Sequence, residues 1–287
     1  MKILNIGSIN KDFFYSVNNF VKPGETISSN KFNIKIGGKG LNQSVAISKA
    51  GKKVYHAGII NKDDKFIINK LKKWNVNCDN ILFSDNPTGH AIIQVDKNGE
   101  NSIIIHAGAN YDIDKKFINS TISKFKSEDI LLIQNEVNSI EDIINIAYKK
   151  NMKIIFNPAP FKKEILSYDL NKISILILNY TEAKHLSGQK SPIKILDSLN
   201  KKYKKTEIIL TLGDKGSIYS YNGSVIRIDA KKIKTIDTTG AGDTFIGYYI
   251  SSIANGLSIE ESLKRANKAA AISTTKLGAA ESIPEIN

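Results

Sequence analysis

The 287-residue chain is 41% hydrophobic, enough for a full core, and its single cysteine, Cys78, excludes an intrachain disulfide and indicates a reducing compartment. The formal net charge of +13 would suit a nucleic-acid-binding protein, but only Arg227 and Arg265 are arginines and few aromatic residues lie between the scattered lysines, which argues against that function. Because no signal peptide or membrane-spanning run is present, we expect no membrane association and a cytoplasmic protein.

Short apolar runs alternate with helical patterns along most of the chain. Such runs favour buried strands of a largely parallel sheet, with helices as the crossover connections. We predict strands at 3–7, 53–60, 130–134, 153–157, 173–179 and 208–213. We predict helices at 41–50, 65–74, 140–150 and 193–203, and one more that opens at a capping box over 258–261. No linker or repeat divides the chain, so we expect a single α/β domain over residues 1–287.

Two regions interrupt this alternation of strands and helices. Residues 13–17 with 32–36, and 91–96 with 102–106, alternate apolar and polar residues beside turn signals such as Asn98-Gly99. These four segments do not fit a parallel sheet easily. We therefore predict a small antiparallel β lid, drawn from about 12–36 and 88–106. A further hairpin around Asn222-Gly223 is expected to extend the main sheet at one edge.

Polar clusters follow several of the predicted strands. In an open parallel sheet, ligands bind beyond the carboxyl ends of the strands. Any one cluster alone is more simply explained as a capped loop. Five of them at the same sheet edge favour a binding site, and they cover residues 7–12, 134–136, 157–160, 179–182 and 211–216.

The run Asp237-Thr238-Thr239-Gly240-Ala241-Gly242-Asp243 directly precedes an apolar pattern at helical spacing. A helix N-terminus with small residues lets a phosphate approach unpaired N–H groups closely. A carboxylate beside a bound phosphate would repel it, so Asp243 makes better sense as a base that takes a proton from an attacking hydroxyl. The alternative is that Asp243 only caps the helix.

A second glycine-rich loop, over residues 37–43, also leads into a predicted helix. It is not a Walker loop, because its lysine lacks the required spacing and the following Ser or Thr. Asn42 offers both a donor and an acceptor, and Asn10, Asp12 and Glu136 are suited to binding vicinal hydroxyls. A polar pocket of this kind, without a metal-ligand cluster, suits a sugar.

These motifs together resemble those of the phosphofructokinase-B-like sugar kinases, also called the ribokinase-like family. The resemblance covers essentially the whole chain, and it is carried by residues 7–12, 23–26, 37–43, 106–110, 157–160, 237–245 and 276–280. It implies a three-layer α/β/α fold with a largely parallel central sheet and a small antiparallel β lid. Among the members of the family, the resemblance is strongest to those that act on ribose.

The resemblance also implies an activity, the ATP-dependent phosphorylation of D-ribose at O5 to ribose 5-phosphate. Asp243 would be the general base, and the amides of Gly240, Ala241 and Gly242 would form an anion hole for the transferring phosphoryl group. The sugar would be held by Asn10, Asp12, Gly38, Lys39, Gly40, Asn42 and Glu136, together with Asp243.

The same resemblance implies cofactors and a partner. ATP would contact Asn179, Thr211, Leu212, Gly213, Asp214, Lys215, Gly216, Gly242 and Asn267. Asn179 and Glu182 would support Mg²⁺, largely indirectly. A K⁺ site would involve Asp237, Thr239, Ser273, Lys276, Gly278 and Ser282, partly through backbone carbonyls. Family members commonly pair through the lid, which implies a homodimer.

Two alternatives stay open at this point. A sibling kinase would act on deoxyribose, fructose or a nucleoside such as adenosine, although the polar loop over 37–43 favours a free sugar over a nucleobase. A non-catalytic sugar- or nucleotide-binding regulator is the other alternative. The presence of Asp243 behind an intact Gly-Ala-Gly run argues against it, because a regulator does not need a base.

Overall fold

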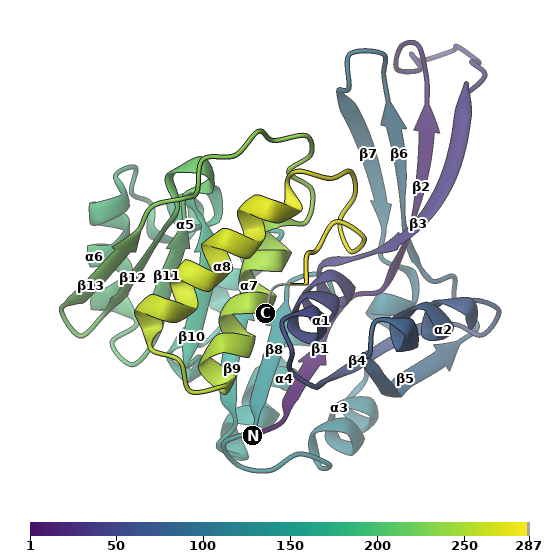
Figure 1. Cartoon of the computed structure of the whole chain (residues 1–287). Coiled ribbons are helices and arrows are strands. Elements are labelled where there is room, and N and C mark those ends of the chain that lie inside the picture. The colour runs from purple at the N-terminus through teal and green to yellow at the C-terminus, as the bar shows by residue number, and fades with distance from the viewer. Residues whose placement is uncertain (286–287) are drawn as a thin grey trace.

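The computed structural model describes residues 1–285 and contains a nine-stranded sheet (Figure 1). The order of its strands is β13-β12-β11-β10-β9-β8-β1-β4-β5, and all pair in parallel except β12 and β13. The strands are β1 (Ile3–Ile6), β4 (Val54–Asn61), β5 (Asn77–Ser84), β8 (Ile130–Gln134), β9 (Lys153–Asn157), β10 (Ile175–Asn179), β11 (Glu207–Thr211), β12 (Ser217–Tyr221) and β13 (Ser224–Ile228).

Helices cover both faces of this sheet, as expected for a three-layer fold. Successive strand residues point to opposite faces, so Ile3 and Leu4 of β1 contribute to two different hydrophobic cores. One core packs under α1 (Lys39–Lys49), α2 (Phe66–Lys73), α7 (Ala241–Ala254) and α8 (Ile259–Ser273). The other packs under α3 (Lys115–Ile122), α4 (Ile140–Lys149), α5 (Tyr180–Ser187) and α6 (Pro192–Lys202).

A second sheet of four strands, the lid, projects from the main body (Figure 1). Its order is β3 (Lys31–Gly37), β2 (Asn10–Ser16), β6 (Gly89–Val95) and β7 (Asn101–His106). The outer pairs β2–β3 and β6–β7 are antiparallel, as predicted for the two hairpins. The central pair β2–β6 is parallel, so the lid is a mixed sheet. The chain returns through the main sheet between the two hairpins, and this return sets their relative direction.

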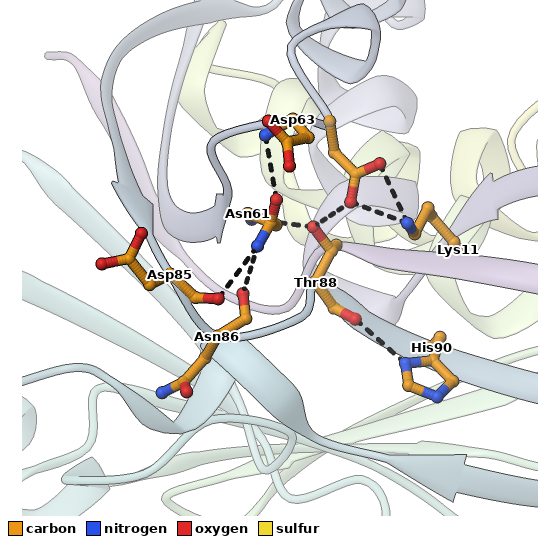
Figure 2. A network of polar contacts seen from close by, with 8 residues as sticks. Lys11, Asn61, Asp63, Asp85, Asn86, Thr88 and His90 are labelled. Atoms are coloured by element: carbon orange, nitrogen blue, oxygen red, sulfur yellow. Dashed lines mark hydrogen bonds and ion pairs between the residues drawn. The ribbon is translucent and has the colours of Figure 1, made fainter.

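Polar contacts tie the base of the lid to the main body, and Figure 2 shows this network around Lys11, Thr88 and Asn61. The Lys11 ammonium in β2 pairs with the Asp64 carboxylate at 2.7 Å. The Thr88 hydroxyl donates to the same carboxylate at 2.6 Å and accepts from the Asn61 backbone amide at 2.8 Å. These contacts place the residue before Asp12 in a fixed position relative to the main sheet.

Most of the predicted elements are confirmed. The six predicted strands and the helices over 41–50, 65–74, 140–150 and 193–203 appear within a few residues of the expected bounds, and the capping box at Ser258 opens α8. The hairpin β12–β13 extends the main sheet at its edge. Sequence reasoning missed β5, α3 and α5. Among residues 1–285, no helix is long and apolar enough to cross a membrane.

Candidate active site

Asp243 lies in the first turn of α7, and its carboxylate does not cap the helix. Gly240 is the N-cap residue, with a left-handed backbone at φ 74° that favours glycine. The Asp243 carboxylate instead accepts side-chain hydrogen bonds from two residues of α1, Asn42 at 3.1 Å and Gln43 at 2.9 Å. The side chain is 6% exposed. Such a carboxylate is suited to act as a base, because it is nearly buried, is oriented by two side-chain amides and does not cap the helix.

The backbone around Gly240 offers amide donors to an anion. The first backbone amide of α7 that makes an i→i−4 helical hydrogen bond is that of Thr244, which donates to the Gly240 carbonyl at 2.8 Å. The amides of Gly242 and Asp243 precede this bond, at the positive end of the helix dipole. The Ala241 amide donates to the Thr238 carbonyl at 3.2 Å, so in this structure it belongs to the turn.

Asn42 presents an unsatisfied acceptor beside Asp243. Its Nδ2 donates to Asp243, whereas its Oδ1 is buried and has no hydrogen-bond partner. A buried acceptor without a partner is costly, and a ligand hydroxyl that donated to it would remove this cost. The orphaned oxygen of Asn42 is therefore suited to accept a hydrogen bond from a hydroxyl beside Asp243.

The glycine-rich loop at the start of α1 is fixed by Glu136, which follows β8. One Glu136 oxygen accepts from the Ser8 hydroxyl at 2.5 Å and from the Lys39 amide at 2.9 Å. A side chain at Gly40 would collide with the backbone of Gly7 and Ser8, so only glycine lets α1 begin this close to β1. Burial raises the pKa of Glu136.

Asn10 and Asp12 lie on β2, where the lid meets the main body. The buried Asn10 side chain accepts from the Asn110 side-chain amide at 2.7 Å, which fixes its orientation. Burial raises the pKa of Asp12 to about 6, and the nearby charge of Glu136 adds to this effect. The sequence predicts Asn10, Asp12 and Glu136 in one sugar site, and in the structure Glu136 lies near enough to Asp12 for its charge to act on that carboxyl group.

Asn179 and Glu182 form a reciprocal capping box at the start of α5. The Glu182 amide donates to the Asn179 side chain at 2.9 Å, and the Glu182 carboxylate accepts from the Asn179 backbone and side-chain amides. The Glu182 side chain is 7% exposed, and burial raises its pKa. The capping box explains why these two residues open a helix that sequence reasoning had missed.

One pocket extends from the Asn179–Glu182 capping box to Asp243. It is lined by residues from the ends of the three strands β9, β10 and β11 and from the starts of the three helices α1, α5 and α7, among them Lys39, Asn179, Glu182, Thr211, Gly242 and Asp243. The nearby charge of Asp243, followed by those of Glu136 and Glu182, raises the pKa of Lys39 above its ordinary value. Lys39 therefore carries its positive charge in a pocket whose other charged lining residues are Glu182 and Asp243.

The segment from Leu212 to Gly216 forms a tight turn after β11. The Leu212 amide donates to the Gly216 carbonyl at 2.8 Å, and Gly213–Lys215 form a short 3-10 turn between them. Asn267 of α8 donates to the Ser217 hydroxyl at 3.0 Å and to the Ile228 carbonyl at 3.2 Å. Its amide thus links α8 to the β12–β13 hairpin, close to where the nucleotide was predicted.

Asp237 bridges the loop before α7 to the loop around Gly278. One Asp237 oxygen accepts from the amide and hydroxyl of Thr239, at 2.9 and 2.6 Å, and the other accepts from the Gly278 amide at 2.8 Å. Partial burial acts to raise the pKa of Asp237, but these hydrogen bonds outweigh it and the pKa is lowered. The hydroxyls of Ser273 and Ser282 donate to the Ala270 and Ala279 carbonyls.

Sequence reasoning did not assign roles to several residues that build this site. Ser8, Gln43, Asn110 and Gln134 are buried and contact predicted site residues or their partners. Ser8, Gln43 and Asn110 lie within motifs that carried the resemblance. The available signal was therefore their membership in those motifs.

Comparison with known proteins decides the family. The model for the pfkB family of carbohydrate kinases matches residues 1–286. The chain belongs to this family. A ribokinase from Haemophilus influenzae is 37% identical over 97% of this chain and 94% of its own length. A deoxyribokinase from Salmonella typhi is 31% identical over 100% of this chain and 96% of its own length.

Solved structures agree with this family assignment. A ribokinase from Cryptococcus neoformans in complex with ADP superposes with a TM-score of 0.88 at 32% identity, over 99% of this chain and 96% of that chain. A ribokinase from Arabidopsis thaliana complexed with ribose and ATP gives 0.87 at 29% identity, with the same coverage. The fold is therefore ribokinase-like, and the protein is a sugar kinase.

Proposed function

We propose that this protein phosphorylates D-ribose at O5 with ATP, giving ribose 5-phosphate and ADP. The observation that carries the proposal is Asp243, a buried carboxylate held by Asn42 and Gln43 at the start of α7 and not used as a cap. The similarity to ribokinases, including one complexed with ribose and ATP, supports ribose as the acceptor.

In the proposed reaction, Asp243 removes the proton from the O5 hydroxyl of the sugar. The O5 atom then attacks the γ-phosphorus, and the bond between this phosphorus and its bridging oxygen breaks, so that ADP leaves with the electron pair. Amides at the start of α7, with those of Gly242 and Asp243 free of helical bonds, would donate to the phosphoryl oxygens. Lys39, which stays positively charged, would neutralise part of their charge.

The sugar would lie between the lid and the start of α1. Asp12 and Asn10 would bind vicinal hydroxyls of the ring, and Glu136 would hold the Gly38–Gly40 loop against it. The unpartnered Oδ1 of Asn42 would accept from another sugar hydroxyl. Each of these groups is polar and buried or half-buried, which suits a free sugar better than a nucleobase.

The chain also has residues whose chemistry suits ATP and Mg²⁺. The turn over Leu212–Gly216, with Thr211 and Asn267, would border the nucleotide, and the pocket-lining Glu182 carboxylate suits Mg²⁺ held through water. Mg²⁺ would neutralise phosphate charge when bound.

Asp237, which joins the loop before α7 to the loop around Gly278, would supply a carboxylate oxygen to K⁺. Backbone carbonyls near Thr239, Ser273, Lys276, Gly278 and Ser282 would complete the oxygen set that suits this ion. A bound K⁺ would stiffen the backbone that leads into Gly240. We expect activity to rise when K⁺ is added to a sodium-based assay buffer, and unchanged full activity without K⁺ would contradict the site.

A second copy of the chain would cover the outer face of the lid. Ile34, Phe13, Ile92 and Ile104 lie side by side in one row across all four lid strands, on the face opposite Asp12. Ile34, Ile92 and Ile104 are 50%, 39% and 65% exposed. A continuous apolar row of this kind favours an interface, and we propose a homodimer formed through it.

Deoxyribose is the second candidate substrate, because the Salmonella relative is a deoxyribokinase of similar identity. ADP release with ribose, 2-deoxyribose, fructose and adenosine separates the candidates. Groups placed to bind a hydroxyl are left unpaired when it is missing, so we expect ribose to exceed 2-deoxyribose by at least about tenfold in kcat/KM. Equal or reversed efficiency would favour the deoxyribokinase assignment, and no sugar-dependent ADP would refute both.

A further inference from the structure

A chain of buried side-chain amides leads to Asp243 from the middle of the main sheet. Gln43 is fully buried in α1 and lies behind Asp243. Its Nε2 donates to Asp243 Oδ1 at 2.9 Å and to Asn157 Oδ1 at 3.1 Å, and its Oε1 accepts from Gln134 at 2.7 Å. The side-chain amide of Gln43, which is not exposed to solvent, therefore connects α7, β9 and β8.

The neighbours of Gln43 fix which way its amide points. Gln134 Nε2 also donates to Asn5 Oδ1 at 3.1 Å, and Asn5 Nδ2 donates onward to the Gly40 carbonyl and to Ser44. Because both Asn5 donors are used, its oxygen faces Gln134. Gln134 must then present its amide hydrogens, and Gln43 must accept them through Oε1. The Nε2 group of Gln43 is thereby directed at Asp243.

The far ends of the network are fixed as well. Asn157 Nδ2 donates to the Ile177 carbonyl at 3.0 Å, so its oxygen faces Gln43. At the other end Ser44 accepts from Asn5 and also hydrogen-bonds His56 Nδ1 at 2.8 Å. Burial lowers the pKa of His56 to about 4, which keeps this ring neutral. A rotated Gln43 amide would place its oxygen against two other oxygens.

We propose that Gln43 is a positioning residue that holds Oδ1 of Asp243, so that Oδ2 is the atom presented to the sugar hydroxyl. Asn42, the other partner of the carboxylate, donates to Oδ2 and has a buried Oδ1 without a hydrogen-bond partner. With Oδ1 held by Gln43, Oδ2 keeps a lone pair besides the one that accepts from Asn42, and it is the oxygen that takes the proton. Gln43 does not contact substrate, and it acts only through the orientation and basicity of Asp243.

The test, which rests on the proposed sugar kinase function, compares the Gln43→Glu and Gln43→Met variants with wild type over pH. Glu in place of Gln puts a second carboxyl group against Asp243, and like charges this close raise the apparent pKa values of the pair. We expect the acid limb of the kcat profile to move up by about one pH unit or more. Met keeps the volume but donates no hydrogen bond, so kcat should fall about tenfold or more at all pH values.

Sugar and ATP KM values should stay within a few-fold in both variants, because neither substrate contacts Gln43. Gln189→Glu is the control for the added charge. This residue lies just after α5, far from α7 in the sequence, so the kcat, KM values and pH profile of the variant should match those of wild type. If Gln43→Glu does not fold by circular dichroism, Gln134→Met removes the group that orients Gln43 and should also lower kcat selectively.

An unshifted acid limb with kcat within twofold of wild type in both Gln43 variants would overturn the positioning role. An equal loss of kcat and substrate affinity, with an unchanged pH profile, would do the same, because it indicates general destabilisation. A wild-type protein inactive on every sugar would instead refute the proposed function on which the test rests.

Discussion

The carboxyl group of Asp12 lies where burial and the charge of Glu136 both oppose its ionisation, and its pKa is raised to about 6. As an ionised group it accepts two hydrogen bonds, whereas the protonated form has lost part of this capacity. Asp12 should therefore bind sugar hydroxyls best above its pKa and less well as the pH falls through about 6.

We expect the dissociation constant for ribose, measured by calorimetry, to rise as the pH is lowered from 7.5 to 5. In the Asp12→Asn variant, ribose should bind more weakly at pH 7.5, and the dependence on pH should largely disappear. Asn keeps the size of the side chain but does not titrate. If the variant kept the wild-type dependence, the titrating group would be another one, and Glu136 is the neighbour to examine.

At the scale of single elements, the helix starts and their glycine-rich loops were predictable because their signals are local. Residues 37–43 and 237–243 carry glycines directly before an apolar helical pattern, and α1 and α7 begin there. Strand β5 was missed because Asn77, Asp79 and Asn80 interrupt any apolar run. Helix α3 has only eight residues, and α5 was hidden in a segment read as a ligand motif.

Contacts between distant elements were less predictable. The parallel pairing of β2 with β6 depends on where the chain re-enters the lid, which no local pattern records. The bond from Gln43 to Asp243 joins residues 200 positions apart, and its direction depends on the whole amide network. Sequence could place both residues in motifs, but only the packing of α1 against α7 brings them together.

The ion pair between Lys11 and Asp64 is expected to stabilise the lid and keep Asp12 in place. It is partly buried, with 23% and 11% side-chain exposure, so it is screened less than a surface pair. Lys11→Met should lower the free energy of unfolding by ~1–3 kcal/mol and raise the KM for ribose, with little effect on the KM for ATP.

The Lys62–Asp85 ion pair is a matched control. It has the same 2.7 Å separation but is exposed, with 61% and 88% side-chain exposure. Lys62→Met should therefore change neither the free energy of unfolding nor the KM for ribose measurably. Chemical denaturation and steady-state kinetics give both readouts. Equal effects of the two substitutions would show that the Lys11 pair does not anchor the lid.

At the scale of the whole molecule, the exposed apolar row on the lid predicts a dimer in solution. Ile104→Lys places a charge at the β7 end of that row, and a buried unpaired charge is costly enough to separate the two copies. Val225→Lys, at an equally exposed position on β13, is the control. Sedimentation velocity should show a wild-type dimer, a monomer for Ile104→Lys and a dimer for Val225→Lys. A monomeric wild type would contradict the proposed interface.

The central claim is that Asp243 removes the proton from the sugar hydroxyl, and the Asp243→Asn variant tests it most directly. Asn keeps the shape of the side chain and removes the base, so the single-turnover rate of ADP formation with saturating ribose and ATP should fall by ~10²–10⁴-fold. The dissociation constants for ribose and ATP, measured by calorimetry, should stay within a few-fold of wild type. A variant that kept more than about a tenth of the wild-type rate would show that Asp243 is not the base.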